Sequence, residues 1–173
     1  MDTYAPFGFI PIGHISGGAI PQPREYVVTT GQVIYKGDPV VLTNTGTVTV
    51  AAAGVTTTHI GVAAEYVTDA ASAAGKKIKI FDDPGIIYKV AVGTGITASA
   101  QTYVFNTADI ITYAVGYATT LTSRMALSTL GTSSLPWIVL GLYESPDNHW
   151  DDTYPVVVVK YNQHVFLAPY AGL

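Results

Sequence analysis

Hydrophobic and polar residues alternate along much of this chain, at the two-residue period of a strand with one buried face. The clearest case is residues 76–92 (KKIKIFDDPGIIYKVAV), where two alternating runs flank the tetrapeptide Asp-Asp-Pro-Gly. Aspartate before proline and glycine is typical of a turn, so this stretch predicts a hairpin-like corner joining two strands.

Similar patterns predict more short strands, separated by turn residues at intervals of about ten. They lie at residues 24–30, 32–36, 40–43, 47–51, 59–66, 102–105, 110–115, 124–128, 136–143 and 154–161. The first four are predicted to form a meander. The uninterrupted run YPVVVVKY (154–161) predicts a strand buried on both faces. Gly61 predicts a close approach of two backbones. Residues 68–75 are predicted to form a single helical turn. The predicted fold is all-β, a compact β-barrel or sandwich.

Residues 1–23 differ from the rest, because prolines and glycines block both a helix and a central strand there. They also carry seven large apolar side chains, too many for a flexible tail: Tyr4, Phe7, Phe9, Ile10, Ile12, Ile15 and Ile20. We therefore predict an extended Pro/Gly-rich N-terminal arm (1–23) that lies on its own domain, a sister subunit or another protein. Residues 24–173 are predicted to form a single β domain.

Composition supports the β prediction, because Val, Ile and Thr supply 56 of the 173 residues. Only 12% of residues are charged, the net charge is −4, and the mean hydropathy is +0.33. This charge pattern argues against nucleic-acid binding and favours a chain that works within an assembly. Apolar runs are too short to predict a membrane span, and residues 1–13 lack the features of a signal peptide. No cysteine is present, which excludes disulfides.

Candidate catalytic and metal-binding residues are sparse. Asp82 and Asp83 are adjacent, so on a strand they would point to opposite faces, and their place before Pro84 suits a turn. The loop 147–152 offers carboxylates and His149, but spacing of this kind is common in polar loops. We predict no metal, no cofactor and no enzymatic activity. Twelve tyrosines with Trp137 and Trp150 could line a sugar-binding face, although their spread along strands favours core and interface positions.

Four stretches together resemble a known family. They are residues 9–26 (FIPIGHISGGAIPQPREY), 37–40 (GDPV), 80–84 (IFDDP) and 135–164 (LPWIVLGLYESPDNHWDDTYPVVVVKYNQH). In order and spacing they resemble the capsid decoration, or cement, proteins of tailed bacteriophages. The resemblance implies a β-rich protein on the outer surface of the virion capsid, commonly a homotrimer. Its partner would be the major capsid protein, whose subunits it locks together.

On this interpretation the arm supplies apolar contacts to the capsid or to a sister protomer. The expected contact residues are Phe7, Phe9, Ile10, Ile12, His14, Ile15 and Arg24. The alternative is a virion-displayed β module that binds carbohydrate or a host surface.

Overall fold

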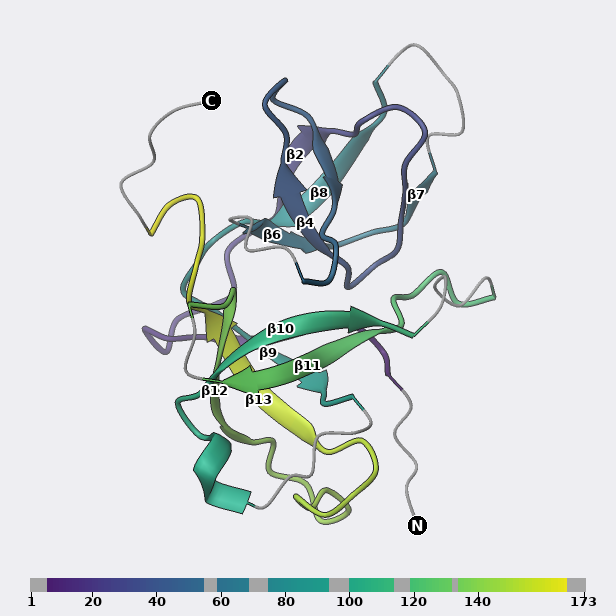
Figure 1. Cartoon of the computed structure of the whole chain (residues 1–173). Coiled ribbons are helices and arrows are strands. Elements are labelled where there is room, and N and C mark those ends of the chain that lie inside the picture. Colours follow the sequence, from purple (N-terminus) through teal and green to yellow (C-terminus); the bar gives the residue numbers. More distant parts are fainter. Residues whose placement is uncertain are drawn as a thin grey trace.

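The computed structural model describes residues 6–54, 59–68, 75–93, 100–113, 119–131 and 134–167. Their strands form three antiparallel sheets packed together in a sandwich-like all-β fold, which confirms the predicted class. Figure 1 shows the two larger sheets as separate layers, with strands β2, β4, β6 and β8 in one and β9 to β13 in the other. The sheets are not closed into a barrel.

The larger sheet has six strands. Their spatial order is β1 (Ile10–His14), β9 (Ile86–Ala91), β13 (Val156–Tyr161), β12 (Trp137–Leu142), β10 (Thr107–Thr112) and β11 (Met125–Gly131). The sheet curls, so that the N–H of Gly93, just after β9, donates to the carbonyl of Leu127 in β11. In β13, Val158 and Lys160 are only half-buried, so the prediction of a strand buried on both faces was wrong for these two residues.

The second sheet has five strands and the third has two. The five-stranded order is β2 (Arg24–Val27), β8 (Lys77–Phe81), β6 (His59–Ala63), β4 (Pro39–Leu42) and β5 (Val48–Val50). The two-stranded sheet pairs β3 (Val33–Ile34) with β7 (Val67–Thr68). A Cβ on Gly61 would lie 2.4 Å from the carbonyl oxygen of Phe81, which confirms the predicted close approach. The described part of the chain includes one short 3₁₀ helix, η1 (Ala100–Tyr103).

Several predicted pairings were wrong. The strands of the expected 76–92 hairpin exist as β8 and β9, but they belong to different sheets, and the turn between them carries the chain from one layer to the other. Of the expected meander, only β4 and β5 are neighbours. Residues 102–105 are not a strand, since η1 and a turn occupy them. The predicted helical turn at 68–75 falls mostly outside the described residues.

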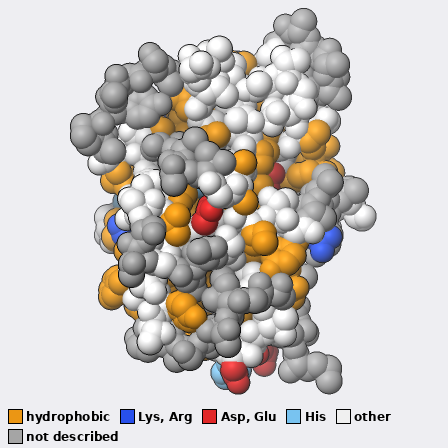
Figure 2. Space-filling view, in the orientation of Figure 1, with side chains coloured by type: hydrophobic (Ala, Val, Ile, Leu, Met, Phe, Trp, Pro, Cys, Tyr) orange, Lys and Arg blue, Asp and Glu red, His pale blue; other side chains and the backbone are white. Residues whose placement is uncertain are grey.

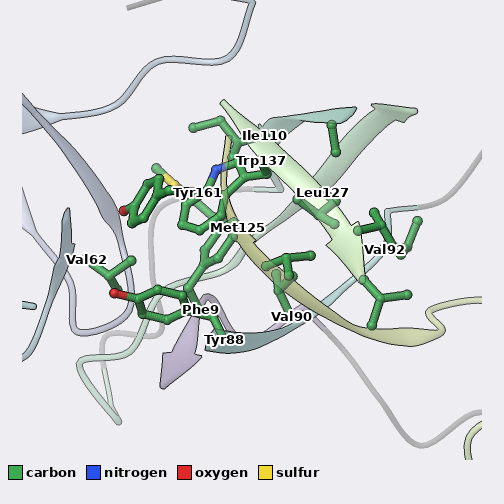
Figure 3. Close-up of a cluster of buried hydrophobic side chains, with 14 of the residues drawn as sticks. Phe9, Val62, Tyr88, Val90, Val92, Ile110, Met125, Leu127, Trp137 and Tyr161 are labelled. Carbon is green, nitrogen blue, oxygen red and sulfur yellow. The ribbon is translucent and has the colours of Figure 1, made fainter. Parts of the chain in front are cut away.

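The core between the layers is built around an aromatic stack, drawn in Figure 3. The rings of Phe9 and Trp137 are stacked with centroids 4.2 Å apart, and Trp137 stacks on Tyr161 at 4.0 Å. Tyr88 meets Phe9, Trp137 and Tyr161 edge to face. Such pairs contribute about 0.5–1.5 kcal/mol each beyond the area that they bury. Phe9 is 1% exposed, so a residue of the predicted arm belongs to this core.

The surface is poor in charge, as the composition predicts. Figure 2 shows one face, on which hydrophobic side chains are scattered among backbone atoms and uncharged side chains, and few charged side chains are visible. None of the described helices is long and apolar enough to span a bilayer.

Candidate functional site

The arm is anchored first at Gly8 and Phe9. The N–H of Gly8 donates to the carbonyl of Met125 (3.1 Å), and the N–H of Phe9 donates to the carbonyl of Gly37 (2.9 Å). Gly8 has φ +78°, and a Cβ there would lie 2.4 Å from the Cβ of Ser123. Glycine is therefore required at position 8 both by backbone angle and by space. This anchor brings residues 9–26 and 37–40 together, two of the stretches that the sequence analysis singled out.

The arm then continues as the edge strand β1, which pairs with β9. The register shifts between Pro11 and Gly13, so Ile12 lies in a bulge. A proline and a bulge are common protections of an edge strand against pairing with another chain, so β1 is not suited to extend the sheet into a partner. Its side chains are the accessible part, with Ile10 40% and Ile12 38% exposed.

A second anchor follows at the turn after β1. The imidazole of His14 lies 3.2 Å (Nε2) from Oδ1 of Asp83 and 2.7 Å (Nδ1) from the hydroxyl of Ser16. Because the N–H of Ser16 also donates to Nδ1, the proton is assigned to Nε2, which donates to Asp83. The N–H of Gly85 donates to the same carboxylate, and a Cβ on Gly85 would lie 2.3 Å from His14 Nε2. These contacts position Ile15, which is 59% exposed.

Serine, histidine and aspartate in this order resemble the hydrogen-bonded groups of a serine hydrolase. The backbone N–H groups that follow Ser16, however, bond within the turn. The N–H of Gly17 donates to the carbonyl of His14, and the N–H of Gly18 donates to the hydroxyl oxygen of Ser16. An oxyanion site needs such donors directed at the substrate. We therefore interpret this cluster as a fastening of the arm, one that the sequence analysis missed because its members lie 69 positions apart.

A third anchor lies where the arm enters β2. Nε of Arg24 is 2.6 Å from Oδ2 of the buried Asp82, and the hydroxyl of Tyr26 donates to the same oxygen. Burial, followed by this hydrogen bond, raises the pKa of Tyr26 to about 12. The guanidinium of Arg24 also lies over the ring of Phe166, 5.4 Å from its centroid. The adjacent carboxylates thus do separate work, Asp82 holding β2 and Asp83 holding the turn after β1.

The seven expected contact residues therefore have different positions. Phe9 lies in the chain's own core, His14 and Arg24 are engaged in the anchors, and Phe7 is half-buried. The accessible apolar side chains are those of Ile10, Ile12 and Ile15, which we call the isoleucine strip. Phe166 and Leu167, each about half exposed, were not predicted, because nothing in the sequence places the end of the chain near the arm.

Two hollows adjoin the arm. The larger, of about 340 Å³, is lined by Phe7, Phe9, Ile10, Pro11, Lys36, Gly37, Ala63, Ala64, Phe81 and Thr122. The smaller, of about 180 Å³, is lined by Phe7, Ile10, Lys89, Tyr143, Asn148 and Val156. Both are open at the surface and mainly apolar, so they can accept side chains of a partner.

Two buried histidines lie where the C-terminal segment returns to the five-stranded sheet. Nε2 of His164 is 2.8 Å from the carbonyl of Ile60, and the N–H of Phe166 donates to Nδ1. His59 is fully buried against Trp137 and Tyr161, and neither of its ring nitrogens has a hydrogen-bond partner among the described residues. Burial, with the nearby His164, lowers the pKa of His59 to about 3, and burial lowers that of His164 to about 4. Both imidazoles are neutral at pH 7.

The loop 147–152 is held by its own hydrogen bonds. The side chain of the buried Asn148 bonds the backbone of Tyr143 and Val156, and Oδ2 of Asp152 accepts the N–H of His149 at 2.8 Å. Within the described ranges no three His, Asp or Glu side chains gather as a metal site would require. Trp137 is a core residue and Trp150 packs half-buried against the same core, so the described tryptophans do not form an open sugar platform.

These features define the class of the protein as an all-β, sandwich-like domain with an anchored N-terminal arm and an apolar strip along it. Comparison of the chain with protein-family models, with curated proteins and with solved structures found no match.

Proposed function

We propose that this protein is a capsid decoration protein, which binds the exterior of a phage head and stabilises contacts between subunits of the major capsid protein. The resemblance described above suggests this role and, with it, a homotrimer. The observation that carries the proposal is the isoleucine strip: three large apolar side chains held at the surface by an arm that is anchored on both sides of them.

The anchoring matters because a preorganised surface loses little conformational entropy when it binds. The exposed areas of the three isoleucines together equal the surface of between one and two fully exposed isoleucine residues. Covering it would contribute roughly 2–4 kcal/mol per copy before the costs of association. A gain of this size suffices when many copies act on one shell, because contacts made together reinforce one another.

The direct test mixes purified protein with shells of the source phage stripped of it. Pelleting measures the bound stoichiometry, and heating measures the stability of the shells. Saturable binding with raised heat resistance is the expected result. Absence of binding at every stage of shell maturation would reject the proposal, and the carbohydrate-binding alternative would then be tested on a glycan array.

The role of the strip is tested by the triple variant Ile10→Thr, Ile12→Thr, Ile15→Thr. Threonine keeps the β-branched shape and removes apolar surface. The matched control is Val27→Thr with Val33→Thr, since these valines are 38% and 39% exposed on the other two sheets. The triple variant should lose shell binding while the control keeps it. Deleting residues 1–23 is a poorer test, because it also removes Phe9 from the core.

A further inference from the structure

The two hollows beside the arm share one ridge. Phe7 and Ile10 line both of them, while their remaining walls differ. The larger hollow extends over residues of the five-stranded sheet, such as Ala63 in β6 and Phe81 in β8. The smaller extends over the six-stranded sheet, at Lys89 in β9 and Val156 in β13. The hollows therefore lie on either side of the Phe7–Ile10 ridge.

Three of the residues that line the larger hollow are small, Gly37, Ala63 and Ala64. Their backbone N–H groups are all engaged, with the carbonyls of Ala63, Asp38 and Lys79 respectively, each at 2.9 Å. The backbones of these three residues thus offer no free donor to a polar ligand. An apolar side chain fits such a site without leaving a buried polar group unpaired.

Each hollow carries one lysine at its side. Lys36 is exposed at the larger hollow, and at the smaller one the ammonium of Lys89 lies 4.7 Å from the centroid of the Tyr143 ring. Neither lysine forms an ion pair within the part of the chain that the structure describes. Among the described residues no Asp or Glu lines either hollow, although acidic residues outnumber basic ones 12 to 8 in the chain. The described lining of the two hollows therefore carries positive charge only, on a protein whose net charge is −4.

We propose that the ridge and its two hollows form a docking site for an acidic, apolar polypeptide segment of the capsid. One apolar side chain of that segment enters each hollow, and its Asp or Glu residues face Lys36 and Lys89. The inference rests on the proposed function and specifies the chemistry of the partner. A polypeptide is the occupant because hollows on opposite sides of a ridge are best filled by two separate side chains, and the two lysines favour a partner with negative charge.

Photochemical capture tests the occupant directly. Phe7 is replaced by benzoylphenylalanine, the protein is bound to stripped shells and irradiated, and the attached segment is identified by mass spectrometry. The control places the same residue at position 105, where the native phenylalanine is 71% exposed and lines neither hollow. Position 7 should capture one capsid segment that contains Asp or Glu beside apolar residues. A segment without acidic residues, or the same segment from position 105, would overturn the inference.

The lysines are tested by the double variant Lys36→Gln, Lys89→Gln, with Lys160→Gln as the control that removes one charge from β13. Exposed ion pairs are weak, so the double variant should bind shells roughly 2- to 30-fold less tightly at low salt. Its affinity should also fall less than the parent's when NaCl is raised to about 0.5 M, because screening acts on the charges that it lacks. Lys36→Arg with Lys89→Arg should restore binding.

These outcomes separate the two proposals. If the parent protein does not bind shells, the proposed function fails and the docking site fails with it. If the parent binds saturably and the double glutamine variant keeps the parent's affinity and salt dependence, the decoration role stands and only the acidic-segment inference is rejected.

Discussion

The buried histidines predict that acid destabilises this protein well before its carboxylates alone would do so. His59 in β6 faces Trp137 of β12, Tyr161 of β13 and His164 of the C-terminal segment. His164 in turn lies against Tyr161 and Phe166, and Asp82 and Asp83 act on it through space. The hydrogen bond to the carbonyl of Ile60 and the two aspartates favour a proton on His164, but burial outweighs them.

The direction of the change in stability with pH follows from the pKa values of the two histidines. In the folded protein they are about 3 for His59 and about 4 for His164, whereas in the unfolded chain they are about 6.5. The unfolded chain therefore binds more protons below pH 6.5, and stability is lost as the pH falls from there towards 4. At pH 5 each histidine should cost about 2 kcal/mol, since each pH unit below 6.5 is worth about 1.4 kcal/mol.

Asp38 acts in the opposite direction. Burial raises its pKa to about 6, so its stabilising contribution is complete below pH 3.8 and is lost as the pH rises through 6. Between pH 8 and pH 5 its protonation should restore about 1 kcal/mol. The net expectation is a loss of about 3 kcal/mol in the free energy of unfolding between these pH values, a large part of the stability of a typical domain.

Urea denaturation at pH 8, 6.5 and 5, followed by tryptophan fluorescence, measures this loss. The informative variant is His59→Leu, which removes from the core two ring nitrogens that have no hydrogen-bond partner among the described residues. It should match or exceed the parent at pH 8 and lose about 2 kcal/mol less than the parent at pH 5. His149→Gln, on the exposed loop, is the control and should follow the parent. A parent as stable at pH 5 as at pH 8, or a leucine variant as acid-sensitive as the parent, would refute the reasoning.

Three further predictions concern single positions. Asp38→Asn should stabilise the protein by about 1–2 kcal/mol at pH 8 and by nothing at pH 4, because it removes a buried charge only where that charge exists; equal effects at both pH values in urea titrations would contradict the assignment. Gly8→Ala should lower the free energy of unfolding by on the order of 3 kcal/mol, because of its φ of +78° and the contact with Ser123. Gly13→Ala, with nothing within 4 Å of the added Cβ, should be almost neutral. Similar melting temperatures for the two variants would argue against the first anchor. Phe105→Asn should raise stability by up to about 1 kcal/mol, since Phe105 holds φ +66° with an exposed ring and asparagine tolerates that angle; a lower melting temperature would show that the ring has a packing role.

From the sequence, the arm could be predicted as a unit, but the position of each of its side chains could not. Its prolines, glycines and apolar side chains marked it as an extended segment lying on a surface, and Ile10, Ile12 and Ile15 are indeed accessible. Phe9 and Ile10 are neighbours of equal apolar character, yet one is buried and the other open. The difference arises from the space beside Trp137, which comes from a strand more than a hundred residues away. For the same reason, the sequence did not predict that Lys36 and Lys89 line hollows beside the arm.

Local patterns in the sequence are enough to predict the all-β class and the positions of most strands, because alternation, β-branched side chains and turn residues act over a few neighbouring positions. Which strands are neighbours in the sheets follows from long-range packing. The local sequence of the turn at Asp82–Gly85 predicts a hairpin between β8 and β9. In the structure, however, β8 pairs with β2 and β6, and β9 pairs with β1 and β13. A turn sets the direction of the chain, whereas the choice of partner depends on which apolar faces can be buried together, and that is a property of the whole chain.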